Sequence, residues 1–305
     1  MKKEKIAFGI PFKASKFTQA LQLCLYSIQK FASEYDYTIY LLADVTNVEL
    51  ASDFPEGTLK QQFPHIIIKH YKRSRIGDYT QALADWVIFE TDAKYAIFLH
   101  SDVYFTDCLV LTQLLQPLKQ NHDISGWEVP FCRYESTFHL SENNQKRFYI
   151  APRICTWLFA VNCTNYRSIG EITQVFWLGN YHVQFLKTQP FPTVIDQNDF
   201  LKWLSSDSVF TEMKKSGLTC LIDIGTFARY FSEKGCIKFF CLGKQSNPNF
   251  DSMEIKDYYQ GFIHIEQFDP ERFDDKFYSS ELLKLRVDIV RNICSNFTNP
   301  PVKYL

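Results

Sequence analysis

The sequence has no excess of either charge, no paired cysteine motif and no long apolar run. Its 33 Lys and Arg residues offset 34 Asp and Glu residues, so no overall field would attract nucleic acid, and an RNA-binding aromatic motif is absent. The nine cysteines are odd in number and form no Cys-X-X-Cys pair, which argues against a zinc ribbon or a disulfide framework. No segment has the length and hydrophobicity of a signal peptide or membrane span. We therefore expect a soluble, cytoplasmic protein with free thiols that does not bind nucleic acid.

The composition is that of a chain with a large core. Of its 305 residues, 46% are hydrophobic and 16% aromatic, which favours a Phe-rich core and leaves aromatic walls for a sugar or base as a second interpretation. No Gly/Ser linker, repeat or low-complexity segment divides the chain. We expect one domain over residues 1–305, with a helical extension at 271–305.

Apolar runs alternate with segments of helical periodicity along the first 120 residues. The predicted strands are 5–11, 38–43, 66–70 and 95–99, and the predicted helices are 17–31, 77–87 and 109–119. Thr106 or Asp107 is a plausible N-cap for the last of these helices. Such alternation predicts an α/β fold whose ligands bind at the C-terminal edge of the strands. Later segments predict strands at 124–131, 155–161 and 219–222, helices at 207–217 and 279–297, a loop at 134–150, and no assignable structure at 171–200.

The triplet His100-Ser101-Asp102 places a carboxylate at the end of the apolar run 95–99. Four stretches in order, Gly9-Ile-Pro-Phe12, Asp44, Arg73 to Asp102, and Trp157 to Gly217, resemble GT-A fold glycosyltransferases, particularly those of family 2. The resemblance implies a GT-A (Rossmann-like) mixed, mainly parallel sheet flanked by helices, with a C-terminal helical tail. It also implies that residues 1–120 form a nucleotide-sugar-binding half and residues 121–270 an acceptor half of the single domain.

The resemblance also implies a nucleotide-sugar site, formed by Pro11, Phe12, Asp44, Arg75, Asp78, His100, Ser101 and Asp102. A fixed carboxylate such as Asp44 can accept a hydrogen bond from a base or ribose. Simpler roles compete with these. Asp44 could cap a turn, and the basic stretch 69–75 could be a solvated loop or could contact anionic lipid.

A divalent metal is the cofactor that the resemblance implies. Asp102 would bind Mn²⁺ or Mg²⁺ on the donor diphosphate, and His264 would complete the metal shell. His100 stands where the first Asp of the family motif is usual, which leaves the metal identity open, since His suits Mn²⁺ better than Mg²⁺. The competing interpretations are a turn-capping Asp102 and a His264 packed among apolar residues.

On the acceptor side, Ser206-Asp207 followed by Gly217 resembles the family's acidic pair at the start of a helix. Asp207 would be the general base that deprotonates the acceptor hydroxyl. It could instead interact with the helix dipole, which would weaken it as a base. Asp196, Asp199 and Asp223 are alternative carboxylates.

The function that these resemblances imply is an inverting, metal-assisted transfer of a sugar from a nucleotide-diphosphate sugar to a hydroxyl of a glycan, lipid or small molecule. A sugar nucleotidyltransferase is an alternative, although the turn at 11–16 has no Gly-rich, basic loop for a triphosphate. A catalytically degenerate nucleotide-sugar-binding module is another alternative. The tail could pack on the domain, contact a membrane peripherally or form a homodimer.

Overall fold

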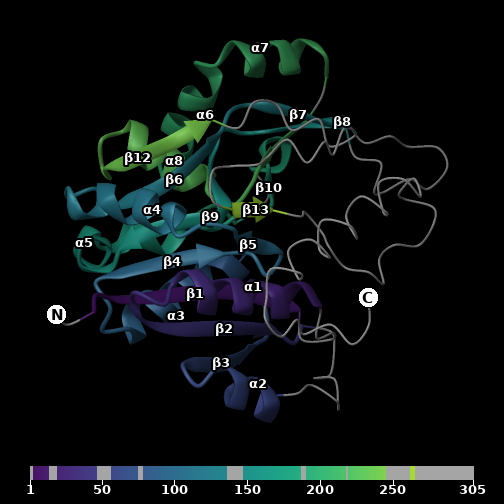
Figure 1. Cartoon of the computed structure of the whole chain (residues 1–305). Helices are drawn as coiled ribbons and strands as arrows, with labels where there is room; N and C mark the ends of the chain where they lie inside the picture. The colour runs from purple at the N-terminus through teal and green to yellow at the C-terminus, as the bar shows by residue number, and fades with distance from the viewer. Residues whose placement is uncertain are drawn as a thin grey trace.

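The fold is built on a seven-stranded sheet in the order β3-β2-β1-β4-β9-β6-β12 (Figure 1). The computed structural model describes residues 3–13, 19–46, 56–74, 78–135, 147–186, 190–217, 219–244 and 262–264. Six of the seven strands are parallel and β9 alone runs antiparallel, between β4 and β6. The strands are β1 (Lys5–Lys13), β2 (Asp36–Asp44), β3 (Ile66–Tyr71), β4 (Tyr95–Leu99), β6 (Ile124–Val129), β9 (Arg153–Asn162) and β12 (Phe239–Lys244).

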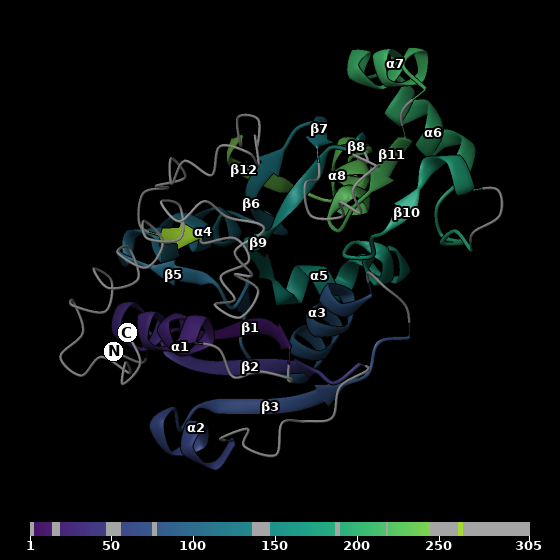
Figure 2. The same ribbon diagram turned by 90° about the vertical axis from the view of Figure 1, so that its right-hand side faces the viewer.

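Helices cover both faces of this sheet (Figures 1 and 2). The core on one face contains buried residues of α1, α2 and α4, and the core on the other contains buried residues of α3, α5 and α8. The helices are α1 (Gln19–Phe31), α2 (Glu56–Gln62), α3 (Tyr79–Glu90), α4 (Leu109–Lys119), α5 (Cys163–Ile169), α6 (Gln197–Ser205), α7 (Ser208–Lys215) and α8 (Thr226–Glu233). The expected class, an α/β fold with a mixed, mainly parallel sheet flanked by helices, is confirmed.

The residue pattern of β1 explains how a strand can be buried on both faces. Ile6, Phe8 and Ile10 point into one core and Ala7 into the other, because successive side chains of a strand alternate between faces. On the Ala7 side the Phe98 ring of β4 lies so close that a Cβ on Gly9 would sit 2.6 Å from it. Glycine at this position therefore makes room for an aromatic side chain of the neighbouring strand.

Two smaller sheets complete the described structure. A four-stranded sheet has the order β10-β11-β8-β7, and a two-stranded sheet pairs β13 with β5. Their bounds are β5 (Val103–Phe105), β7 (Cys132–Glu135), β8 (Arg147–Ile150), β10 (Tyr181–His182), β11 (Thr219–Ile222) and β13 (Phe262–His264), with short 3-10 helices η1 (Glu171–Val175) and η2 (Val183–Phe185).

Several sequence predictions need correction. The segment 134–150, expected to be a loop, includes the end of β7 and all of β8, two strands that pair in the second sheet. The residue before α4 is Cys108, and Asp107 contributes by accepting the N–H of Leu109 at 2.8 Å. The unassigned stretch 171–200 holds η1, β10, η2 and the first turn of α6.

The predicted helix at 279–297 lies outside the described residues. Among the helices that are described, none is both long and apolar enough to cross a lipid bilayer.

Candidate functional site

The turn 100–102 lies at the point where the direction of strand addition reverses. From β1 the chain adds β2 and β3 on one side, and then places β4 on the other side of β1. Ligands of open α/β sheets bind outside the carboxyl ends of the strands at such a switch point. His100, Ser101 and Asp102 follow β4 directly, so the structure places the predicted triplet where a ligand site is expected.

Backbone hydrogen bonds hold this turn in place. The N–H of His100 donates to the carbonyl of Trp157 at 3.0 Å, and the N–H of Val103 donates to the carbonyl of His100 at 3.1 Å. Residues 100–102 are half-buried. Burial raises the pKa of the Cys24 thiol on α1 well above its usual value, and the nearby Asp102 carboxylate raises it further. Asp102 therefore lies near Cys24 of α1.

The strand β13 comes back to this turn from a distant part of the sequence. It pairs antiparallel with β5, with His264 opposite Val103, the residue after Asp102. Phe262 anchors the strand, because its ring is fully buried and lies 5.0 Å from the ring of Trp127. The backbone thus brings together the two residues predicted to bind a metal, although the side chain of His264 lies outside the described structure.

The donor set at this turn fits a hard divalent cation. A half-buried carboxylate, an imidazole on the facing strand and the oxygens of a diphosphate are ligand types that Mn²⁺ accepts, and Mg²⁺ accepts the oxygens. Among the side chains that the structure describes, no group of three or more His, Cys, Asp or Glu is arranged to hold a metal.

Asp44 ends β2 with its carboxylate already bonded. The residue is 3% exposed, its Oδ1 accepts the N–H of Thr46 at 3.0 Å, and its Oδ2 pairs with Arg73. Burial raises the pKa of the Asp44 carboxyl, but the hydrogen bonds from Thr46 and the ion pair with Arg73 together outweigh burial and lower it. Asp44 is thus an ionised turn-capping group whose charge is neutralised by Arg73.

Asp78 closes the adjoining loop. Its Oδ2 accepts from the N–H and the hydroxyl of Ser74, at 3.0 and 2.5 Å, and from the Tyr71 hydroxyl at 3.2 Å. The pKa of Tyr71 is raised to about 12, chiefly by burial and next by the charge of Asp78. The Tyr71 hydroxyl therefore keeps its proton and remains a donor. Asp78 therefore shapes the start of α3, and Arg75, which was predicted with it, lies outside the described residues.

Tyr79 ties the ends of β1 and β2 together. Its buried hydroxyl accepts the N–H of Phe12 at 3.0 Å and contacts the carbonyls of Phe12 and Leu42. The Phe12 side chain is buried in the core, whereas Pro11 before it is half-buried. The predicted turn residues Pro11 and Phe12 therefore lie at the same edge as Asp44, with the backbone of Phe12 bonded to Tyr79.

The acceptor-side carboxylates do not form one cluster. Asp207 caps α7 and accepts the N–H of Val209 at 2.8 Å, and in both views α7 lies beyond the second sheet, away from β5 (Figures 1 and 2). Asp196 caps α6, and Asp199 is in the first turn of that helix. Asp223, by contrast, forms an ion pair with Arg153 at the start of β9, on the edge where the parallel strands end.

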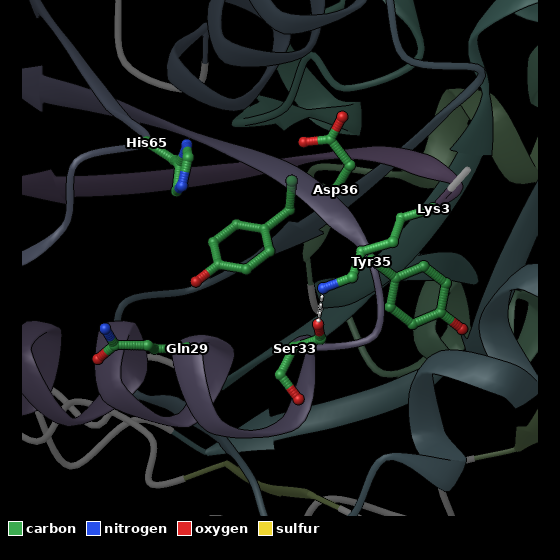
Figure 3. A pocket seen from close by; sticks show the side chains of 7 residues that line it. Lys3, Gln29, Ser33, Tyr35, Asp36 and His65 are labelled. Atoms are coloured by element: carbon green, nitrogen blue, oxygen red, sulfur yellow. Dashed lines mark hydrogen bonds between the residues drawn. The ribbon is translucent and has the colours of Figure 1, made fainter. Parts of the chain in front are cut away.

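A hollow on the opposite edge of the sheet is unrelated to these residues. It lies at the first residues of β1 and β2 and is lined by Lys3, Gln29, Ser33, Tyr35, Asp36, Tyr37 and His65 (Figure 3). The Lys3 ammonium donates to the carbonyl of Ser33 across it at 2.6 Å. Because ligand chemistry in such sheets gathers at the carboxyl ends of the strands, the turn 100–102 is the better candidate for a functional site than this hollow.

No protein-family model matches the sequence, and no curated protein matches it significantly. Solved structures to which the chain is similar include a protein described as a nucleotide-diphospho-sugar transferase from Desulfovibrio desulfuricans G20, with 10% identity and a TM-score of 0.39 over 81% of this chain and 82% of that one. Another is GalNAc-T7 with UDP, GalNAc and Mn²⁺, with 14% identity and a TM-score of 0.39 over 55% of this chain and 37% of that one. A third is 4-diphosphocytidyl-2C-methyl-D-erythritol synthase, with 10% identity and a TM-score of 0.36 over 55% of this chain and 79% of that one. Similarity at this level establishes no family, so the function has to be inferred from the site.

Sequence reasoning missed the residues that hold the site together. Arg73 stood in a stretch that resembles the family and was otherwise interpreted as a solvated loop or a lipid contact, but it was given no role of its own. Its pairing with Asp44 has no local signal, because 29 positions separate the two. Tyr79 and Arg153 were not singled out either. Each bonds to a segment remote in sequence, which periodicity does not reveal.

Proposed function

We propose that this chain is a GT-A type glycosyltransferase that moves a sugar from a nucleotide-diphosphate sugar to an acceptor hydroxyl, with inversion and with the help of a divalent metal. The observation that carries the proposal is the placement of Asp102 at the switch point of the sheet, with His264 one residue away across the β5–β13 pair. A carboxylate and a late His at the carboxyl end of β4 are suited to hold a metal on a diphosphate.

Asp102 and His264 would hold the metal, which would neutralise charge on the departing nucleoside diphosphate. The backbone bonds of His100 to Trp157 and Val103 fix the turn, so that the Asp102 carboxylate is positioned before the donor binds. Such preorganisation is what makes electrostatic stabilisation effective.

Two carboxylates are candidates for the base that takes the proton of the acceptor hydroxyl. The sequence pattern points to Asp207, which in the fold caps α7. Position favours Asp223, because its partner Arg153 opens β9, the strand beside β4, on the edge where His100 and Asp102 lie. In either case the hydroxyl oxygen attacks the anomeric carbon and the carboxylate takes its proton, while the bond from the anomeric carbon to the phosphate oxygen breaks and the nucleoside diphosphate leaves.

The first test is a thermal-shift panel of UDP-, GDP-, dTDP- and CMP-sugars, each with and without Mn²⁺. We expect metal-dependent stabilisation by one class of donor, and we expect Asp102→Ala to abolish it. Asp107→Ala is the matched control, because it removes a nearby carboxylate that bonds the N–H of Leu109 at the start of α4.

Turnover separates the remaining roles. The base variant, Asp207→Ala or Asp223→Asn, should keep donor binding and lose transfer, and product anomers measured by NMR report inversion. Metal-independent binding of a nucleoside triphosphate would favour the nucleotidyltransferase alternative, and donor binding without transfer to any acceptor would favour a binding module. No shift with any donor would refute the proposal.

A further inference from the structure

The end of β2 offers a ligand a guanidinium rather than a carboxylate. Asp44 is 3% exposed and both of its oxygens are engaged, Oδ1 by the N–H of Thr46 and Oδ2 by Arg73. A carboxylate used in this way has little left to accept from a base or a ribose. The Arg73 side chain is 27% exposed, so it is the group that a ligand at this strand end would meet.

The guanidinium is held in a defined orientation. Asp44 binds the guanidinium on one side, and the guanidinium carbon lies 5.7 Å from the centre of the Tyr79 ring. The backbone N–H of Arg73 donates to the Thr46 hydroxyl at 2.7 Å, which fixes the start of the side chain. The Tyr79 ring is itself stacked on Tyr71, with centres 6.0 Å apart. Among the described residues Arg73 Nε is buried without a hydrogen-bond partner, so the donors within reach of a ligand are those of the terminal nitrogens.

A guanidinium holds two N–H donors in one plane at a fixed spacing, and such a pair recognises two neighbouring acceptor atoms of a ligand. Guanine has such a pair in O6 and N7, to which arginine binds bidentately, and cytosine has one in O2 and N3. Uracil separates its two carbonyl oxygens by an N–H, and adenine places an amino group beside N1 and N7. An N–H facing the guanidinium would be repelled.

We propose that Arg73 determines the nucleotide specificity of the donor site and selects a base with two neighbouring acceptor atoms, guanine or cytosine. This inference rests on the proposed function, because it takes the end of β2 as part of a nucleotide site. Bidentate recognition of this kind changes affinity by about tenfold or more.

The test is a calorimetric titration of the full chain with GDP, CDP, UDP and ADP in the presence of Mn²⁺. GDP or CDP should bind at least about tenfold more tightly than UDP and ADP, and which of the two binds names the base. Arg73→Lys keeps a positive charge for Asp44 but lacks the planar fork, so this variant should bind all four nucleotides with similar affinity. If the lysine variant fails to fold, Arg73→Gln replaces it in the test. Its side chain has a single amide donor group, so this variant should also lose the preference among the four nucleotides.

Lys72→Met is the matched control, because it removes an exposed positive charge from the neighbouring position and should leave the order of affinities unchanged. The melting temperature without nucleotide shows whether Arg73 is only structural: a lower value with an unchanged order of affinities would overturn the inference. Tightest binding of UDP or ADP would overturn it as well and leave the proposed function standing. If no nucleotide binds to the wild-type chain, the proposed function fails and the inference fails with it.

Discussion

Replacing Asp85 by asparagine should stabilise the protein at neutral pH. Asp85 lies half-buried on α3, close enough to Tyr166 of α5 to affect its pKa, and its Oδ1 accepts a hydrogen bond from Gln81 at 2.8 Å. Burial raises the pKa of the Asp85 carboxyl from 3.8 to about 6, and the Gln81 hydrogen bond only partly opposes this effect. The ionised carboxylate is therefore disfavoured in the folded state, whereas the unfolded chain ionises at its usual pKa.

The sign and size follow from proton linkage. Between the unfolded pKa of 3.8 and the folded pKa of about 6, the folded state binds more protons, so its stability falls as the pH rises and levels off above the folded pKa. The shift corresponds to about 3 kcal/mol, and we expect about 2 kcal/mol after solvent screening. The asparagine amide keeps the acceptor for Gln81 and carries no charge, so D85N should melt about 4 °C higher at a pH of about 7.5.

The assay is thermal and urea denaturation of both proteins from about pH 3.5 to about pH 8. The difference in free energy of unfolding between D85N and the wild type should reach its full value above about pH 7. It should be close to zero at about pH 3.5, where Asp85 is largely protonated in both the folded and the unfolded state. Glu90→Gln, at an exposed position of the same helix, is the control and should show no such pH-dependent gain. A D85N variant that is no more stable at the alkaline end, or equally more stable at the acid end, would refute the reasoning.

Three further predictions concern packing and buried polar groups. Gly225 has φ +89°, and a Cβ there would overlap the Ile154 carbonyl oxygen. G225A should therefore lower the free energy of unfolding, measured by urea denaturation, by roughly 3 kcal/mol or more. The control G57A lies in α2 with open space around it and should be neutral or slightly stabilising. Arg229→Met should lower the free energy of unfolding by roughly 3 kcal/mol, because among the described residues it leaves the buried Glu128 a single cationic partner, Lys244 at 3.8 Å. Adding Glu128→Gln should recover most of the loss, and an equally unstable double variant would contradict this account. Tyr79→Phe should lower stability by about 1–3 kcal/mol, because the N–H of Phe12 loses its partner, and unchanged hydrogen exchange at Phe12 would count against it.

Apolar runs reveal the strands that are buried along most of their length. Such runs predicted strands at 5–11 and 95–99, and the structure has them at 5–13 and 95–99, because residues 6–10 and 95–99 are all buried. The pairing of β5 with β13 has no such signal, since each strand has three residues and their partnership depends on tertiary contacts. The strands β7 and β8 of the second sheet have four residues each, which is also too short for a periodic pattern. The sequence therefore predicted a loop at 134–150, where the end of β7 and the whole of β8 lie.

The candidate site divides along similar lines. An apolar strand followed by His-Ser-Asp predicted that Asp102 reaches the ligand edge of the sheet, because the positions of strand ends follow from the fold class. The state of Asp44 was not predictable, since its neutralisation by Arg73 depends on where the segment after β3 lies. Local sequence thus indicates which groups reach the ligand edge, and tertiary contacts determine which of them remain free to act.

The antiparallel strand β9 explains why so many of these contacts meet at one edge. Because β9 runs against its neighbours, its first residues, not its last, lie where the parallel strands end. From there the Trp157 carbonyl binds the turn after β4, and Arg153 binds Asp223 just after β11 of the second sheet. One reversed strand therefore connects the proposed donor turn to the elements that follow it in the chain. Arg153→Met, which breaks the pair with Asp223, should therefore impair acceptor use more than it weakens nucleotide binding. Steady-state kinetics in which donor binding is impaired more than acceptor use would argue against this division of the edge.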